Sequence, residues 1–76
     1  MTYREALALG EKVLEVANIV DVRTDAWLLL EMASKIDRNF YYMHMDELVA
    51  EDKKLQYEEL IQRRASHIPL QQITGK

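Results

Sequence analysis

This chain has few of the residues that form tight turns, because its 76 residues include only two glycines and one proline. Hairpin-rich folds depend on such residues at their turns, and no alternating apolar pattern is long enough to make a sheet. The composition, 49% hydrophobic and 30% charged, is that of a globular rather than a disordered chain. We therefore expect an all-α fold, a small bundle of four to five helices.

The chain opens with the start signal of a helix. Thr2 and Glu5 have the spacing of a capping box, in which each side chain accepts a hydrogen bond from the other residue's backbone N–H. Apolar residues at helical spacing follow and predict a helix over residues 3–17. Asn18 can end it in the left-handed conformation, and we expect Ile19-Val20 to pack beneath the turn.

A second helix is predicted directly after this turn. Asp21 is a suitable N-cap, and the apolar stripe that follows extends to Ile36. Asp37 is expected to close this helix and to start a short third one. We place Trp27 at the edge of the stripe.

The run Phe40–Met45 is dense in aromatic residues and methionine. Our main interpretation is one or two helical turns that fill the core, because a small domain needs such residues for burial. The alternative is a surface that binds a partner protein, since tyrosine and methionine are enriched in such patches. The candidate residues of that partner surface are Trp27, Tyr41 and Tyr42.

The last third of the chain predicts a long helix and a short one. We expect the turn at Leu48–Val49 to anchor the chain, and the long helix to begin near Ala50 or Glu51. The charge of Glu51 suits a helix N-terminus. His67 falls where a left-handed residue would end this helix. Pro69 is then the expected first residue of a final helical turn that closes at Gly75.

Charge and composition narrow the classes of partner. Thirteen acidic and ten basic residues give a net charge of -3, which disfavours direct binding to nucleic acid. The chain contains no cysteine, so disulfides and cysteine-based zinc sites are excluded. No apolar stretch resembles a signal peptide or a membrane span, and we expect a cytoplasmic protein without a membrane partner.

The residues do not predict a catalytic, cofactor-binding or metal site within this chain. His44 and His67 are the only histidines, and their spacing is not that of a metal site. A nucleophilic dyad would lack a suitable base, and no glycine-rich loop could hold phosphates or a dinucleotide.

Arg63 and Arg64 lie at the predicted end of the long helix, where they would complement the helix dipole from its surface. A more specific hypothesis is that one of them pairs with Asp25, which borders the apolar stripe of the second helix. A bidentate arginine–carboxylate contact would suit such a partly buried position.

Several of these positions match the pattern of one protein family, most specifically near the end of the chain. That strong part is Arg63-Arg64, then Pro69, then Gln71 and Ile73-Thr74-Gly75. The weaker matches are Ala6-Leu7, Asp25-Ala26, Leu29-Leu30, Arg38 and Leu48. Over essentially its whole length, the chain resembles the N-terminal domain of the HemK-type protein-(glutamine-N5) methyltransferases, which modify bacterial peptide chain release factors.

Three positions depart from the family's pattern. Gln72 stands where tyrosine is usual, so we expect an aromatic contact at the junction to be missing. His67 stands in place of a glycine, and Asn18 replaces a glycine-like turn residue. Both can adopt the left-handed conformation that such turns require.

The resemblance implies a division of labour. Residues 1–68 would be a helical substrate-recognition domain, and residues 69–76 the start of a linker to a catalytic methyltransferase domain. In the family that domain is Rossmann-like, binds S-adenosylmethionine and holds the target glutamine with an Asn-Pro-Pro-Tyr motif, which this chain lacks. The expected partners are the release factor and the protein's own C-terminal catalytic domain. The residues assigned to the interdomain junction are Arg63, Arg64, Pro69, Gln71, Ile73, Thr74 and Gly75.

A free-standing helical adaptor that binds a partner through residues 40–45 is the alternative function. A reading frame that continues past Lys76 into an Asn-Pro-Pro-Tyr sequence would favour the methyltransferase, and a stop codon there would favour the adaptor. A nucleic-acid-binding module is disfavoured by the net charge and by the lack of a clear recognition helix.

Overall fold

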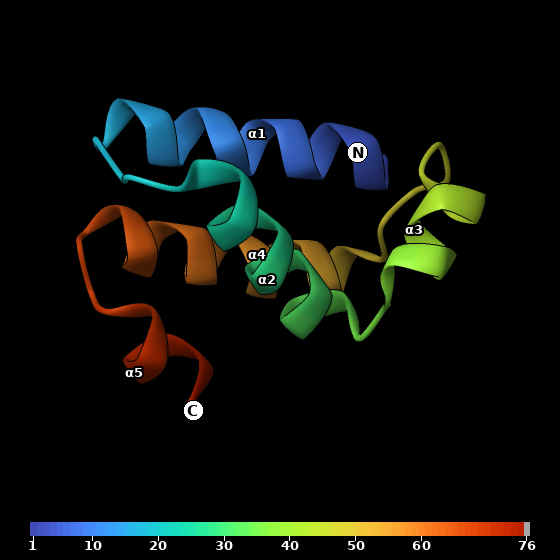
Figure 1. Cartoon of the computed structure of the whole chain (residues 1–76). Helices are drawn as coiled ribbons and strands as arrows, with labels where there is room; N and C mark the ends of the chain where they lie inside the picture. The colour runs from blue at the N-terminus through green and yellow to red at the C-terminus, as the bar shows by residue number, and fades with distance from the viewer. Residues whose placement is uncertain (76) are drawn as a thin grey trace.

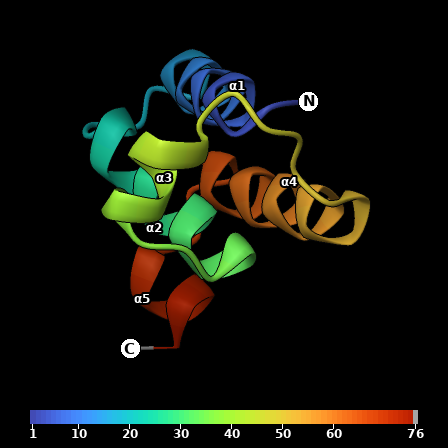
Figure 2. The same ribbon diagram turned by 90° about the vertical axis from the view of Figure 1, so that its right-hand side faces the viewer.

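The computed structural model describes residues 1–75, and within them the chain forms helices and no strand. The five helices are α1 (Tyr3–Val16), α2 (Val22–Ser34), α3 (Arg38–His44), α4 (Glu51–Ala65) and α5 (Leu70–Thr74). The three longer helices, α1, α2 and α4, pack against one another, while α3 and α5 lie towards opposite ends of this core (Figures 1 and 2). The predicted small all-α bundle is confirmed.

The capping box at the start of α1 forms as the sequence predicts. The backbone N–H of Glu5 donates to the Thr2 hydroxyl at 3.1 Å, and the N–H of Thr2 donates to the Glu5 carboxylate at 2.8 Å. Hydrogen bonding of the Glu5 carboxylate by Thr2, mainly by its backbone N–H and then by its side chain, lowers the pKa of Glu5 below its usual 4.5. The contribution of these hydrogen bonds to stability is therefore present above that pH and is lost as the pH falls through the lowered pKa.

Thr2→Ala is expected to lower the free energy of unfolding by about 1 kcal/mol, because it removes the side-chain acceptor of the cap. Urea denaturation followed by circular dichroism measures the loss. Thr2→Ser is the matched control, since serine keeps the hydroxyl and should retain most of the stability. Equal losses in the two variants would contradict the role assigned to the hydroxyl.

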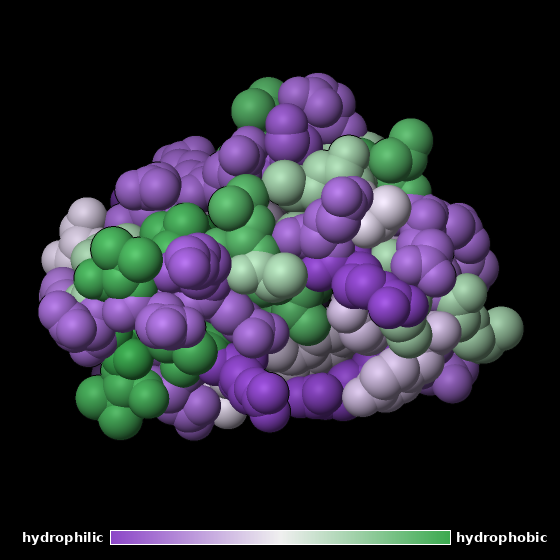
Figure 3. Space-filling view, turned by 90° about the horizontal axis from the view of Figure 1, so that it is seen from above, coloured by the Kyte–Doolittle hydropathy of each residue, from purple (hydrophilic) through white to green (hydrophobic). Residues whose placement is uncertain are grey.

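The turn between α1 and α2 is only partly as predicted. Asn18 is left-handed, with φ at 63°, and α1 ends at Val16, one residue earlier than expected. Ile19 is buried beneath the turn, whereas Val20 is fully exposed, so its predicted burial is wrong. Hydrophobic surface gathers at this end of the molecule, towards the left of Figure 3.

The second helix starts where predicted but ends sooner. The Asp21 side chain accepts a hydrogen bond from the N–H of Thr24 at 3.4 Å, and α2 runs only to Ser34. Lys35 ends it in a left-handed conformation, with φ at 57°, so the expectation that Asp37 closes this helix is wrong. Asp37 instead caps α3, by accepting from the N–H of Phe40 at 2.8 Å.

The core lies between α1, α2 and α4 and is closed by residues from both ends of the chain. Its buried residues are Tyr3, Ala6, Leu14, Ile19, Ala26, Trp27, Leu29, Leu30, Ala33, Ile36, Val49, Tyr57, Leu60, Ile61 and Ile73. Trp27 is 6% exposed and therefore belongs to this core, whereas the apolar pattern of the sequence predicted a position at the edge of the stripe. The Tyr57 hydroxyl donates to the carbonyl of Ala6 at 2.9 Å, and burial raises the pKa of Tyr57.

The expectation that the aromatic run fills the core is wrong. No residue of α3 is buried, and Phe40, Tyr42 and Met43 are 37%, 62% and 71% exposed. The core is formed by the three longer helices together with Ile19, Ile36, Val49 and Ile73, and the half-buried Tyr41 of the aromatic run packs against it. In the following turn Val49 is buried as predicted, but Leu48 is 74% exposed and anchors nothing through burial.

Candidate functional site

The predicted junction begins with a sharp turn after α4. His67 is left-handed as predicted, with φ at 65°, and its ring nitrogen Nε2 lies 2.8 Å from the carbonyl oxygen of Ala17. Pro69 has an extended backbone and is the N-cap of α5, so the expectation that it is the first helical residue is wrong. Gly75 ends α5 in the left-handed region, with φ at 75°.

The final helix packs onto the bundle. Ile73 is 6% exposed and joins the core, and α5 contacts both α4 and α2. Gln71 and Gln72 are exposed, whereas Thr74 is half-buried and donates its hydroxyl to the Leu70 carbonyl at 3.1 Å. The described part of the segment 69–76 is therefore a docked helix. The assignment of these residues to an interdomain junction, and of the boundary at residue 68, stays a prediction.

Arg64 connects α4, α2 and the turn before α5. Its Nε lies 2.9 Å from Oδ2 of Asp25, and its Nη1 donates to the carbonyl of Ile68 at 3.0 Å. The predicted pairing of an arginine with Asp25 is confirmed, but through a single hydrogen bond from Nε and not as a bidentate contact. Arg63 is exposed.

The three residues of the candidate partner surface differ in exposure. Trp27 is buried, and Tyr41 is half-buried with its ring edge-on to the indole at 5.5 Å. Tyr42 is 62% exposed and packs edge-on against Tyr41 at 5.6 Å. The three are neighbours, but only Tyr42 is freely accessible. Their role in binding a partner stays a prediction.

Two hollows open on the surface near these groups. One, of about 340 Å³, lies between α2 and α5, and is lined by Leu28, Glu31, Met32, Lys35, Leu70 and Thr74. The other, of about 290 Å³, lies between α1, α2 and α3, and is lined by Leu7, Glu11, Arg23, Thr24, Trp27 and Arg38. Sequence reasoning missed Arg23 as a site residue and used Arg38 only as a weak family match. No local signal could pair them, since they belong to different helices.

Within residues 1–75, no three side chains of the metal-binding types converge on one point. In the same part of the chain, every helix is too short or too polar to cross a bilayer.

Comparison with known proteins supports the family resemblance over nearly the whole chain. A family model described as the PrmC N-terminal domain matches residues 5–75. A release factor glutamine methyltransferase of Koribacter versatilis (strain Ellin345) is 33% identical over 75 residues, which are 99% of this chain and 27% of that protein. A protein of the same name from Clostridium botulinum (strain Hall) is 35% identical over 75 residues, 99% of this chain and 26% of that protein.

This chain thus spans about a quarter of the length of the curated relatives that it matches. No solved structure matches it significantly. Because the family model covers nearly all of the sequence, the resemblance to the HemK-type N-terminal domain is confirmed, and the chain belongs to the PrmC N-terminal domain family.

Proposed function

We propose that this chain is the release-factor-recognition domain of an S-adenosylmethionine-dependent methyltransferase. The parent enzyme would N5-methylate the glutamine of the Gly-Gly-Gln motif in peptide chain release factors, in the cytoplasm, during the cycle of translation termination. The observation that carries the proposal is the family match over residues 5–75, together with relatives that are named release factor glutamine methyltransferase. The second partner would be the enzyme's own C-terminal catalytic domain.

The described residues do not fit S-adenosylmethionine. A cofactor cradle of the Rossmann type needs glycines between a strand and a helix N-terminus. Here Gly10 lies in the middle of α1, where a Cβ atom would be 1.9 Å from the Tyr57 hydroxyl, and Gly75 follows the last helix. The hollow between α1, α2 and α3 carries two arginines, which would repel the cofactor's sulfonium group. The cofactor therefore belongs to the parent enzyme's catalytic domain in this proposal.

A separate recognition domain suits the chemistry of glutamine methylation. An amide nitrogen is a poor nucleophile, so much of the rate must come from holding it in line with the methyl donor. Contacts far from the reacting atoms can contribute to that positioning. Burial of Ile73 and the hydrogen bonds of Arg64 hold α5 against the bundle. This supports a fixed angle between the helical recognition domain and the proposed catalytic domain.

Isothermal titration calorimetry on the 76-residue chain tests the proposal. We expect the unmethylated release factor of the same organism to bind and S-adenosylmethionine to give no binding heat. Micromolar binding of S-adenosylmethionine would contradict the division of labour. A release factor that fails to bind would instead favour the alternative of a free-standing adaptor, for which the exposed Tyr42 and Met43 of α3 offer a surface.

A further inference from the structure

The hollow between α1, α2 and α3 holds an arginine in a defined position. The guanidinium carbon of Arg38 lies 4.7 Å from the centre of the Trp27 ring, a cation–π geometry. The indole is itself fixed, because it is 6% exposed and Tyr41 packs edge-on against it at 5.5 Å. Trp27 thus presents the Arg38 guanidinium at the rim of the hollow.

Among residues 1–75, the basic groups of this hollow have no acidic partner. In this described part of the chain, neither Arg23 nor Arg38 forms an ion pair or donates a side-chain hydrogen bond. By contrast, Arg4 pairs with Asp46 and Arg64 with Asp25. Glu11 is the one acidic residue that lines the hollow, so the lining is net positive although the chain has a net charge of -3.

A guanidinium held over an indole ring can still bind a carboxylate. The contact with the ring uses the guanidinium carbon, 4.7 Å from the ring centre, and no acceptor among residues 1–75 takes up the N–H donors, so they are available for a bidentate pair. Because the side chain is already ordered, less conformational entropy is lost when the carboxylate binds. Arginine, tryptophan and tyrosine are also the residues that most often dominate binding energy at protein interfaces.

We propose that this hollow binds an acidic segment of a partner protein, with Arg38 as the main anchor and Arg23 as a second contact. The identity of the partner rests on the proposed function, according to which the acidic segment belongs to the release factor. RNA fits less well, because two arginines on an acidic protein can neutralise few phosphates. Commitment to a carboxylate-bearing protein makes the surface testable with simple probes.

Trp27 is the chain's single tryptophan, so its fluorescence reports directly on the hollow. Three probes should be titrated into the 76-residue chain: a hexaglutamate peptide, a hexauridylate RNA and the unmethylated release factor. We expect the peptide and the release factor to change the fluorescence, with affinities that fall as salt is raised. Tighter binding of the RNA than of the peptide would overturn the proposal.

Variants locate the contact. Arg38→Gln is expected to weaken binding of the hexaglutamate peptide and of the release factor about tenfold. Arg38→Lys should recover only part of the lost affinity, because lysine keeps the charge but not the planar fork. Arg23→Gln should weaken binding less. Lys12→Gln removes the same charge from an exposed position on α1 outside the hollow and should leave binding within about twofold.

The possible outcomes separate this inference from the proposed function. If the release factor binds wild type and Arg38→Gln equally, the surface is wrong and release-factor recognition stands. If the peptide binds through Arg38 but the release factor does not bind, the acidic-segment surface stands and the proposed function fails. If neither the peptide nor the release factor binds the wild-type chain, both the acidic-segment surface and the proposed function are overturned.

Discussion

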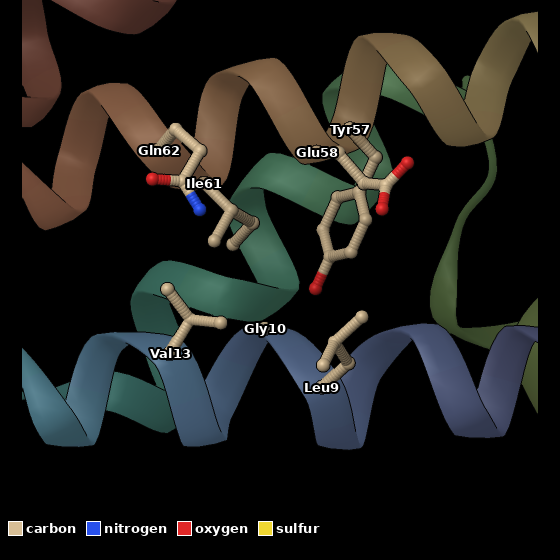
Figure 4. A pocket seen from close by; sticks show the side chains of 7 residues that line it. All are labelled: Leu9, Gly10, Val13, Tyr57, Glu58, Ile61 and Gln62. Carbon is tan, nitrogen blue, oxygen red and sulfur yellow. The ribbon is translucent and has the colours of Figure 1, made fainter.

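Replacing Gly10 with alanine will destabilise the fold by about 1–3 kcal/mol, although alanine is the better helix former. A Cβ atom at this position would lie 1.9 Å from the Tyr57 hydroxyl oxygen and 3.0 Å from Cδ1 of Ile61. Figure 4 shows the Tyr57 ring reaching from α4 to α1 beside Gly10. The missing side chain is what lets the two helices approach so closely.

Tyr57 cannot move aside at low cost. It is 1% exposed, and its hydroxyl donates a hydrogen bond to the carbonyl of Ala6, so displacement would also leave a buried donor unpaired. For a chain of this length the expected total stability is roughly 4–11 kcal/mol. The loss is therefore large enough to lower the melting temperature clearly, which differential scanning calorimetry measures.

Two controls isolate the close approach. Ala8→Gly, at an exposed position of α1, should cost about 1 kcal/mol, so that alanine is favoured there as in most helices. In a Tyr57→Phe background the nearest clashing atom is gone, and Gly10→Ala should cost less than it does in the wild type. An equal cost in both backgrounds would show that the Tyr57 hydroxyl is not the obstacle.

The sequence predicted features that depend on short-range backbone chemistry. The caps at Thr2 and Asp21 and the left-handed turns at Asn18 and His67 each follow from what one residue offers its neighbours. Gly10 carried no such signal, because its role depends on a tyrosine from a different helix. A glycine within a helical pattern looks only like a weak position until the partner helix is known.

The candidate site was less predictable than the bundle, for a related reason. Burial of α3 was inferred from the hydrophobicity of its residues, but composition does not say which hydrophobic segment the core has room for. Trp27 was placed at an edge because apolar spacing cannot show that Tyr41 and Arg38 cover it. The Asp25 pairing could be anticipated, since a carboxylate beside an apolar stripe needs a charged partner.

Asp25→Asn is expected to lower the free energy of unfolding by about 2–3 kcal/mol, somewhat less than the loss of a partner from a fully buried ion pair. The two side chains are largely shielded, with relative exposures of 11% for Asp25 and 21% for Arg64. The substitution leaves the Arg64 charge without its carboxylate. Urea denaturation measures the effect, and Arg63→Gln, at the exposed neighbouring position, should change stability by less than about 0.5 kcal/mol.

Arg64→Gln should act on α5 as well as on the ion pair. It removes the donor to the Ile68 carbonyl, a contact that Asp25→Asn leaves in place. Amide hydrogen exchange should therefore speed up at Ile73 and Gly75, whose N–H groups bond within α5, more in Arg64→Gln than in Asp25→Asn. The double variant should cost less than the sum of the single ones, because each single change leaves one group unpaired. Strict additivity, with equal exchange in α5, would mean that Arg64 does not couple the bundle to the final helix.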